Sequence, residues 1–184
     1  MKRIEWKNIF FALLICSLVY TGAIYVAPTL SVTSEKAPSK TATTTLYNAN
    51  GQNIGVVTLS DTGAGVKMQV SATQLSPGKH GIHIHQKPFT GFDFTTAGEH
   101  FNPYGKKHGL ENPQGYHLGD MPNLEVKQDG TANAEFLLQG ANLIKGDNNS
   151  LLGKSVIIHA KEDDQKTDPA GNSGDRIAGA NIPE

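Results

Sequence analysis

The histidines are the residues of this sequence whose spacing most clearly suggests chemistry. His83 and His85 lie two residues apart in the segment KHGIHIHQ (79–86), whose alternation predicts a β-strand. Alternate side chains of a strand project from the same face, about 7 Å apart, so these two imidazoles would lie side by side. Neighbouring imidazoles suit a transition metal, but half-exposed strand histidines without a metal are also common. The pair alone leaves both interpretations open.

A second set of candidate ligands lies in the segment 87–122, which is rich in Gly and Pro and lacks strand-like alternation. It carries His100, His108, His117 and Asp120, spaced 8, 9 and 3 residues apart. Three imidazoles and one carboxylate suit a closed tetrahedral zinc site. Such a site would supply the energy to order a loop of this length. The alternative interpretation is a set of solvated loop histidines.

The cysteine count restricts the ligands that a metal could have. Cys16 is the only cysteine, which excludes an intrachain disulfide, a cysteine-rich zinc site and a C-x-x-C redox pair. Any metal must therefore be held by histidines and carboxylates. His159 adds one more candidate at the end of an apolar run, where a buried core histidine is the alternative. Chance would have to explain all of these positions together, so the sequence favours a metal centre.

The segments that must position these side chains are typical of an all-β domain. Eight of them are rich in Val, Ile and Thr with alternating polarity, and turn residues separate several of them. They lie at residues 41–48, 53–60, 65–73, 79–86, 123–127, 131–138, 154–160 and 176–182. Eight short strands without a helical period after residue 40 favour a β-sandwich or flattened barrel. The segments 87–122 and 161–175 are then long loops.

The N-terminus predicts export. Residues 9–27 carry no charge, follow three basic residues and one acidic residue, and are long enough to span a bilayer as a helix. We expect residues 1–27 to form a signal anchor, with a cleaved signal peptide as the alternative. Residues 28–40 mix Pro, Ser, Thr and Lys as a flexible linker, and residues 41–184 form the exported domain. An uncleaved anchor would make the membrane a partner.

Charge and composition exclude other classes of protein. The chain has 16 Lys and Arg against 17 Asp and Glu, a net charge of −1. A nucleic-acid-binding protein needs clustered excess basic residues, so we expect no nucleic-acid partner. Such a small net charge also argues against a disordered chain.

Several segments, taken in order, resemble the metal-binding motifs of the copper-zinc superoxide dismutase family. The resemblance covers roughly residues 43–182 and rests on HGIHIH (80–85), TAGEHFNP (96–103), KKHG (106–109), YHLGD (116–120), VIIHAKEDD (156–164) and GNSGDR (171–176). It implies an eight-stranded Greek-key β-sandwich or flattened barrel with long metal-binding loops. It also implies copper and zinc as cofactors and superoxide as the substrate, which is converted to oxygen and hydrogen peroxide. A bacterial member that is exported or membrane-anchored would suit the N-terminal segment.

The resemblance also implies a role for each candidate residue. His100 would bridge the two metals as an imidazolate and carry a proton during turnover, and Arg176 would position the superoxide anion. The copper ligands would be His83, His85, His100 and His159. The zinc ligands would be His100, His108, His117 and Asp120. Two further residues would support the ligands, Asp163 by linking a copper-ligand histidine to a zinc-ligand histidine and His80 as a structural histidine nearby.

The sequence departs from the family pattern at the intrachain disulfide. Phe94 and Gly179 stand where many members have the two cysteines, so zinc and packing must order the loop here. Two alternatives to the enzyme remain open at this point: a non-catalytic relative that buffers or stores copper or zinc, and a structural or adhesive β-sandwich. The metal motifs do not encode the oligomeric state.

Overall fold

The computed structural model describes residues 40–184. The expected signal segment (1–27) and the expected linker (28–40), apart from Lys40, lie outside the described residues. Within the described range, no helix reaches the length and apolarity that a membrane span requires. The described chain is all-β, as predicted, and consists of nine strands and one 3-10 helix: β1 (Thr41–Asn48), β2 (Asn53–Asp61), β3 (Gly65–Ala72), β4 (Gly78–His80), β5 (Ile82–His85), η1 (Phe94–Ala97), β6 (Leu124–Val126), β7 (Ala132–Gln139), β8 (Ser155–His159) and β9 (Arg176–Asn181).

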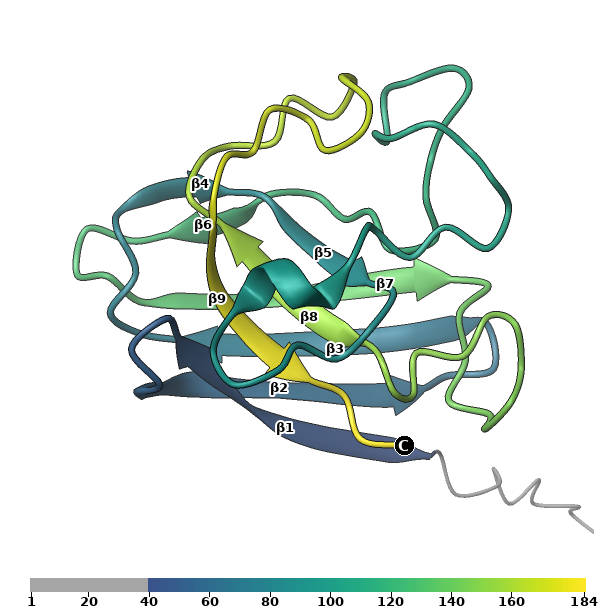
Figure 1. Cartoon of the computed structure of the whole chain (residues 1–184), viewed down its shortest axis with the longest axis horizontal. Coiled ribbons are helices and arrows are strands. Elements are labelled where there is room, and N and C mark those ends of the chain that lie inside the picture. The colour runs from purple at the N-terminus through teal and green to yellow at the C-terminus, as the bar shows by residue number, and fades with distance from the viewer. Residues whose placement is uncertain (1–39) are drawn as a thin grey trace, which may run out of the picture. The chain divides into compact units, whose positions relative to one another are not determined.

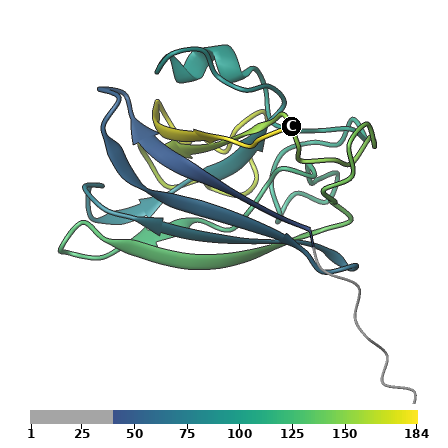
Figure 2. The same ribbon diagram turned by 90° about the horizontal axis from the view of Figure 1, so that it is seen from below.

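The strands form one curled seven-stranded sheet and a two-stranded ladder. The sheet has the order β5-β8-β9-β1-β2-β3-β7, and β4 pairs with β6; every paired ladder is antiparallel. The curl brings β5, β8 and β9 over the half formed by β1, β2, β3 and β7 (Figures 1 and 2). Buried apolar side chains of the two halves fill the space between them. The sequence predicted an all-β domain of eight strands, and the structure has the all-β class in the form of a curled seven-stranded half-barrel with a separate two-stranded ladder.

The difference arises at the predicted strand 79–86, which divides at Gly81 into β4 and β5. Gly81 leaves the ladder because its N–H donates to the Lys161 carbonyl and its own carbonyl accepts from the His159 N–H, both at 2.8 Å. A Cβ at Gly81 would lie 2.8 Å from the Ser173 Cβ, so only glycine fits this close approach. Before Gly81 the chain therefore pairs with β6, as β4, and after Gly81 it pairs with β8, as β5.

Strand β5 separates the apolar core from the histidines. Ile82 and Ile84 belong to the main core, whereas the alternate residues His83 and His85 project from the opposite face. Strand β8 also has two different faces. Val156 and Ile158 join the main core, whereas Ile157 packs on the opposite face with η1 and its neighbouring loop. Helix η1 lies on that outer side of the sheet (Figure 2). The loops that carry the remaining candidate ligands thus cover the outer face of β5 and β8.

Candidate metal centre

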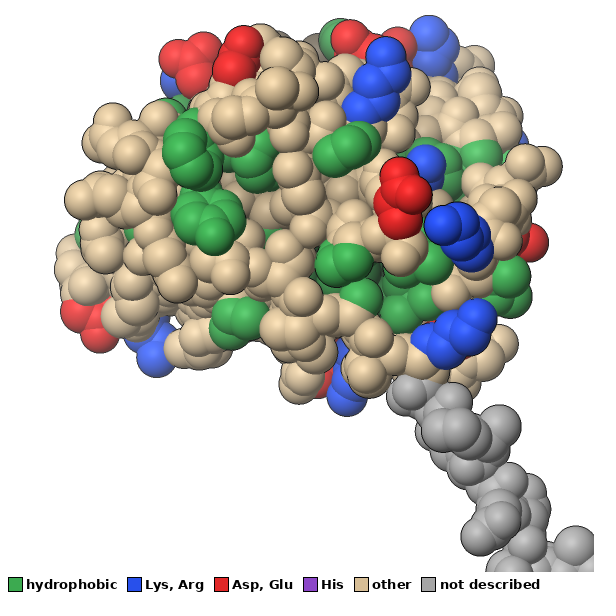
Figure 3. All heavy atoms as spheres, turned by 60° about the horizontal axis from the view of Figure 1, so that its bottom comes forward, with side chains coloured by type: hydrophobic (Ala, Val, Ile, Leu, Met, Phe, Trp, Pro, Cys, Tyr) green, Lys and Arg blue, Asp and Glu red, His purple; other side chains and the backbone are tan. Residues whose placement is uncertain are grey.

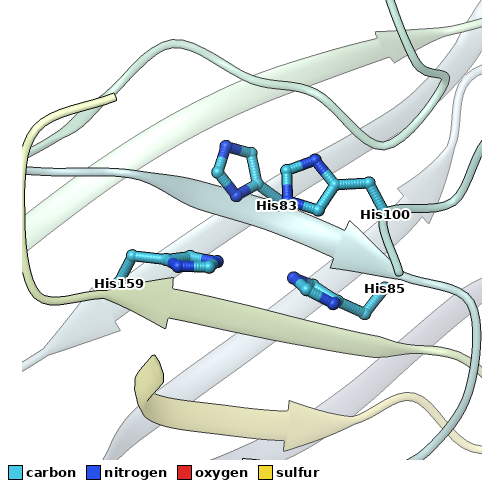
Figure 4. Close-up of side chains that lie close together, drawn as sticks. All are labelled: His83, His85, His100 and His159. Carbon is cyan, nitrogen blue, oxygen red and sulfur yellow. The ribbon is translucent and has the colours of Figure 1, made fainter. Parts of the chain in front are cut away.

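Four histidine rings surround one space on the outer face of β5 and β8 (Figure 4). His83 and His85 come from β5, and His159 ends β8. His100 comes from the long loop, and its main chain forms an isolated antiparallel β-bridge with that of His85. The ring centroids lie 4.0–6.4 Å apart, and one nitrogen of each ring falls within 4.8 Å of the other three. All seven histidines of the chain are buried, and none shows on the face drawn in Figure 3. The structure gathers the four residues that were predicted as copper ligands.

The four nitrogens that face this space lack a hydrogen-bond partner among the described residues: His83 Nδ1, His85 Nε2, His100 Nε2 and His159 Nε2. On three of the rings the other nitrogen faces an acceptor oxygen: His83 Nε2 at 2.7 Å from Asp163 Oδ2, His85 Nδ1 at 2.9 Å from Gly98 O, and His159 Nδ1 at 3.1 Å from Gly174 O. In a neutral imidazole the nitrogen that faces an acceptor carries the hydrogen, so the opposite nitrogen presents a lone pair. Converging buried lone pairs fit a four-nitrogen copper site.

Asp120 is the centre of a second group. Its Oδ2 accepts from the main-chain N–H groups of Gly109 and His117, at 2.9 and 3.0 Å. Its Oδ1 lies close to the Nδ1 atoms of three histidines: 3.0 Å from His100, 3.1 Å from His108 and 3.2 Å from His117. Tetrahedral zinc with bonds of about 2.0–2.1 Å spaces its ligand atoms about 3.3 Å apart. One carboxylate oxygen and three imidazole nitrogens at these separations therefore fit zinc.

His83 also approaches the second group. One of its nitrogens falls within 4.8 Å of the ligand atoms of His100, His108 and Asp120. However, its Nε2 is bonded to Asp163 and its Nδ1 faces the first group. The third imidazole beside Asp120 is that of His117, whose Nδ1 lies 3.2 Å from Asp120 Oδ1, and its role as a zinc ligand stays a prediction.

Asp163 connects the two groups. Its Oδ2 accepts from His83 Nε2 at 2.7 Å, and its Oδ1 lies 3.0 Å from His108 Nε2. Asn123 fixes the main chain of Asp163, because its side-chain amide donates to the Asp163 carbonyl at 2.9 Å and accepts from the Asp163 N–H at 2.8 Å. Asp163 was expected from the sequence as a support of the ligands, whereas Asn123 was not. No local pattern marks this asparagine, which lies 40 residues from its partner.

His80 supports the first group from behind. Its Nδ1 lies 2.7 Å from the carbonyl of His159, and its Nε2 lies 2.9 Å from the carbonyl of Ser76. Its ring therefore ties the loop before β4 to the main chain at the end of β8. His80 belongs to neither group of candidate ligands, consistent with the structural position expected for it.

Arg176 lies at the edge of the first group. It is the cross-strand neighbour of His159 in the β8–β9 ladder, and its side chain is half-buried. Its Nη1 donates to the carbonyls of Phe94 and Thr95, at 2.8 and 3.2 Å. Burial lowers the pKa of both His85 and His159, and the nearby Arg176 charge lowers both further. A fixed cation thus stands beside the four-nitrogen site.

Burial and hydrogen bonding give the two groups different protonation states in the metal-free protein. Burial lowers the pKa of His83 to about 3 and that of His159 to about 4, so these rings are neutral. Burial also acts to lower the pKa of His108, but its bonds to Asp120 and Asp163 raise it to about 9. Burial raises the pKa of both carboxyls, yet their bonds to histidines hold both well below the usual range. A metal ion would replace the protons of this second group.

The metal-free protein is therefore expected to be most stable near pH 6.5. Below that pH, His83 and His159 become protonated in the unfolded chain but stay neutral in the folded protein. The folding stability therefore falls as the pH drops toward their folded-state pKa values of about 3 and 4. Above it the proton that folding holds on His108 is lost, so stability falls as the pH rises toward about 9. Thermal melting of the metal-free protein across this range tests the prediction, and a melting temperature that rises steadily with pH contradicts it.

Comparison with known proteins agrees with this geometry. The sequence model of the family described as copper/zinc superoxide dismutase (SODC) matches residues 53–182. Superoxide dismutase [Cu-Zn] 2 of Aquifex aeolicus is 45% identical in an alignment 141 residues long, and the alignment covers 72% of this chain and 81% of the relative. The extracellular superoxide dismutase [Cu-Zn] of Brugia pahangi is 32% identical in an alignment 160 residues long, which covers 81% of this chain and 79% of the relative. The crystal structure of a SOD-like protein from Bacillus subtilis superposes with a TM-score of 0.72 at 38% identity, covering 77% of this chain and 97% of that one.

The match of the family model extends from β2 to the residue after β9 and so includes both histidine groups. The chain belongs to the copper/zinc superoxide dismutase family, whose members use copper and zinc to dismute superoxide.

Proposed function

We propose that this chain is an exported superoxide dismutase that works at one paired metal centre. His83, His85, His100 and His159 would hold copper, and His100, His108, His117 and Asp120 would hold zinc. The proposal rests on the convergence of four buried ring nitrogens that have no hydrogen-bond partner among the described residues. One of them is His100 Nε2, and the other nitrogen of that ring, Nδ1, lies 3.0 Å from Asp120 Oδ1. Residues 41–184 would form the catalytic domain, a Greek-key barrel in which β4 and β5 are two halves of one strand.

Each side chain around the copper site then has a distinct task. Copper, when bound, supplies the one-electron chemistry by which two superoxide anions and two protons become oxygen and hydrogen peroxide. Arg176 attracts the anion, and its two bonds to main-chain carbonyls hold the guanidinium in one place. His100 can hold a proton at Nε2, the buried nitrogen that faces the copper site. Arg176 would thus bind the substrate, and His100 would supply a proton.

Hydrogen bonds from the surrounding residues hold the histidine rings in fixed orientations. Asp163 fixes the orientation of the His83 and His108 rings at once, so that the copper and zinc sites share one support. The carbonyls of Gly98 and Gly174 select the tautomers of His85 and His159. These bonds leave the rings little freedom to turn, which favours a site already shaped for its metal.

The rate of the purified chain loaded with copper and zinc tests the proposal, with Arg176→Ala and Arg176→Lys as companions. We expect Arg176→Ala to slow dismutation by about tenfold or more at unchanged copper content, because the cation that attracts the anion is lost. Arg176→Lys should retain part of the rate, since a positive charge remains. A loaded chain no faster than chelated copper would contradict the enzyme. Stoichiometric metal binding without turnover would favour the metal-storing alternative.

The export part of the proposal rests on the sequence. Residues 1–27 would act as a signal anchor or signal peptide, and residues 28–40 would be a linker to the catalytic domain. Three relatives are named extracellular superoxide dismutases, which is consistent with export. In bacterial cells expressing the full chain, protease added after permeabilising only the outer barrier should degrade the domain. A domain that stays protected until the cytoplasmic membrane is lysed contradicts export.

A further inference from the structure

The loop between β5 and His100 determines where the Arg176 guanidinium lies. We call residues 87–98 the aromatic loop, because they contain Phe89, Phe92 and Phe94 and include η1. Arg176 donates to the carbonyls of Phe94 and Thr95, the first two residues of η1. A displacement of η1 would carry both acceptors with it. Whatever fixes η1 on the sheet therefore also fixes Arg176.

The Phe94 ring fastens η1 to β9. Phe89 and Phe94 are buried and meet edge to face with their centroids 4.9 Å apart, and with Ala97 and Ile157 they form a small apolar cluster, here called the aromatic clamp. The clamp presses against Gly179 in β9, where an added Cβ would lie 2.9 Å from atoms of both phenylalanine rings. Real Cβ atoms do not approach other atoms so closely, and ring carbons cannot yield as a flexible side chain does. The rings thus occupy the space that a side chain at position 179 would fill.

A side-chain amide closes the same loop onto β9. Asn181 Nδ2 donates to the Phe89 carbonyl, and Asn181 Oδ1 accepts from the Phe89 N–H, each at 2.9 Å. This pair imitates one rung of a β-ladder and satisfies both main-chain groups of Phe89. The Asn181 carbonyl in turn accepts from the Thr44 hydroxyl at 2.7 Å, which links the attachment to β1. The loop is therefore held by ring packing at position 94 and by hydrogen bonding at position 89.

We propose that Phe94 and Asn181 are positioning residues for Arg176, holding the substrate-binding guanidinium by non-covalent attachment of the aromatic loop to β9. The inference rests on the proposed role of Arg176 in binding the anion. Phe94 and Gly179 are also the positions at which the family resemblance would place a disulfide, and the chain has no second cysteine to form one. Ring packing against a glycine here supplies the contact between the loop and β9.

Two readouts report on the guanidinium without relying on turnover. Arg176 is the one arginine between residues 40 and 184, and Arg3 is the other in the chain, so modification by phenylglyoxal can be followed at Arg176 by peptide mass spectrometry. This reaction needs no metal. In the copper-loaded protein, optical titration with azide measures the affinity for a small anion that would bind beside Arg176.

We expect Phe94→Ala and Asn181→Ala to speed the modification of Arg176 about fivefold or more and to weaken azide binding by a similar factor, because the guanidinium loses its fixed acceptors. Phe92→Ala is the matched control. Phe92 lies in the same loop, but its half-exposed ring packs on Tyr47 and Gly51, and Arg176 does not bond to its carbonyl. Both readouts should stay at the wild-type value in this control.

Combining each variant with Arg176→Ala separates positioning from general support. In the Arg176→Ala background, Phe94→Ala and Asn181→Ala should leave azide affinity unchanged, since the group that they position is gone. Wild-type rates of Arg176 modification in both variants would overturn the inference, even if their melting temperatures fall. If Phe94→Ala does not fold, Asn181→Ala still decides, because it removes hydrogen bonds without opening the apolar cluster. Azide affinity that is the same in wild type and Arg176→Ala would instead contradict the proposed role of Arg176, while the phenylglyoxal test of positioning would stand.

Discussion

Withdrawing zinc from the loaded protein is expected to lower its melting temperature by about 8–16 °C. An ion at a thousand times its dissociation constant adds about 4 kcal/mol to folding stability, and each kcal/mol shifts the melting temperature of a domain this size by about 2–4 °C. The physical reason lies at Asp120 Oδ1, where three imidazole nitrogens crowd one buried oxygen within 3.2 Å. Zinc would satisfy all four atoms and join three distant points of the loop. Since Cys16 is the only cysteine, no intrachain disulfide shares this task.

Melting curves of metal-free, zinc-loaded and zinc-stripped samples at one pH provide the measurement. Asp120→Asn is the control, because asparagine keeps the shape of the side chain but loses the charge that zinc requires. Its melting temperature should be nearly the same with and without zinc. A wild-type protein that melts at the same temperature after chelation would show that packing alone orders the loop.

The fold was largely predictable because β-structure leaves a local signature. Seven of the eight predicted strands match observed strands to within about one residue at each end, since alternation and turn residues mark them directly. The segment 79–86 alternates without interruption, so nothing in it signals that the pairing partner changes at Gly81. Helix η1 was missed for a related reason: four residues are too few to display a helical period.

The candidate ligands, and Asp163 and His80 beside them, could be proposed from residue type, spacing and family resemblance together, but their other supports could not. The H-x-H pattern places His83 and His85 on one face of β5 whatever the rest of the chain does. By contrast, the Gly98 and Gly174 carbonyls that select histidine tautomers are main-chain groups, which every residue has. Asn181 likewise carries no mark of its bond to Phe89, which spans 92 residues. Such contacts follow from the folded path of the chain and only the structure reveals them.

Replacing Gly171 with alanine is expected to weaken zinc binding by about 10–100-fold and to reduce dismutation accordingly. Gly171 has a φ of +61°, and a Cβ there would lie 2.8 Å from His108 Nε2 and closer still to the Asp163 carboxylate. The methyl group would therefore break the contact between His108 and Asp163. This contact orients the ring of His108, a candidate zinc ligand, and Asp163 also orients the ring of His83, a candidate copper ligand. Loss of this buried pairing should also lower the melting temperature of the metal-free protein.

Gly105→Ala supplies the control for backbone strain. Gly105 also has a φ of +61° and lies in the metal-binding loop, but an added Cβ would meet no atom within 4 Å. Both substitutions force alanine into a left-handed conformation at a cost of about 1 kcal/mol, whereas only Gly171→Ala drives a methyl group into the Asp163–His108 contact. Competition with a chromophoric chelator gives the zinc affinity of each variant. Because strain is matched, any larger loss in Gly171→Ala measures what the Asp163 link contributes, and equal losses would mean that the link does not orient the zinc ligands.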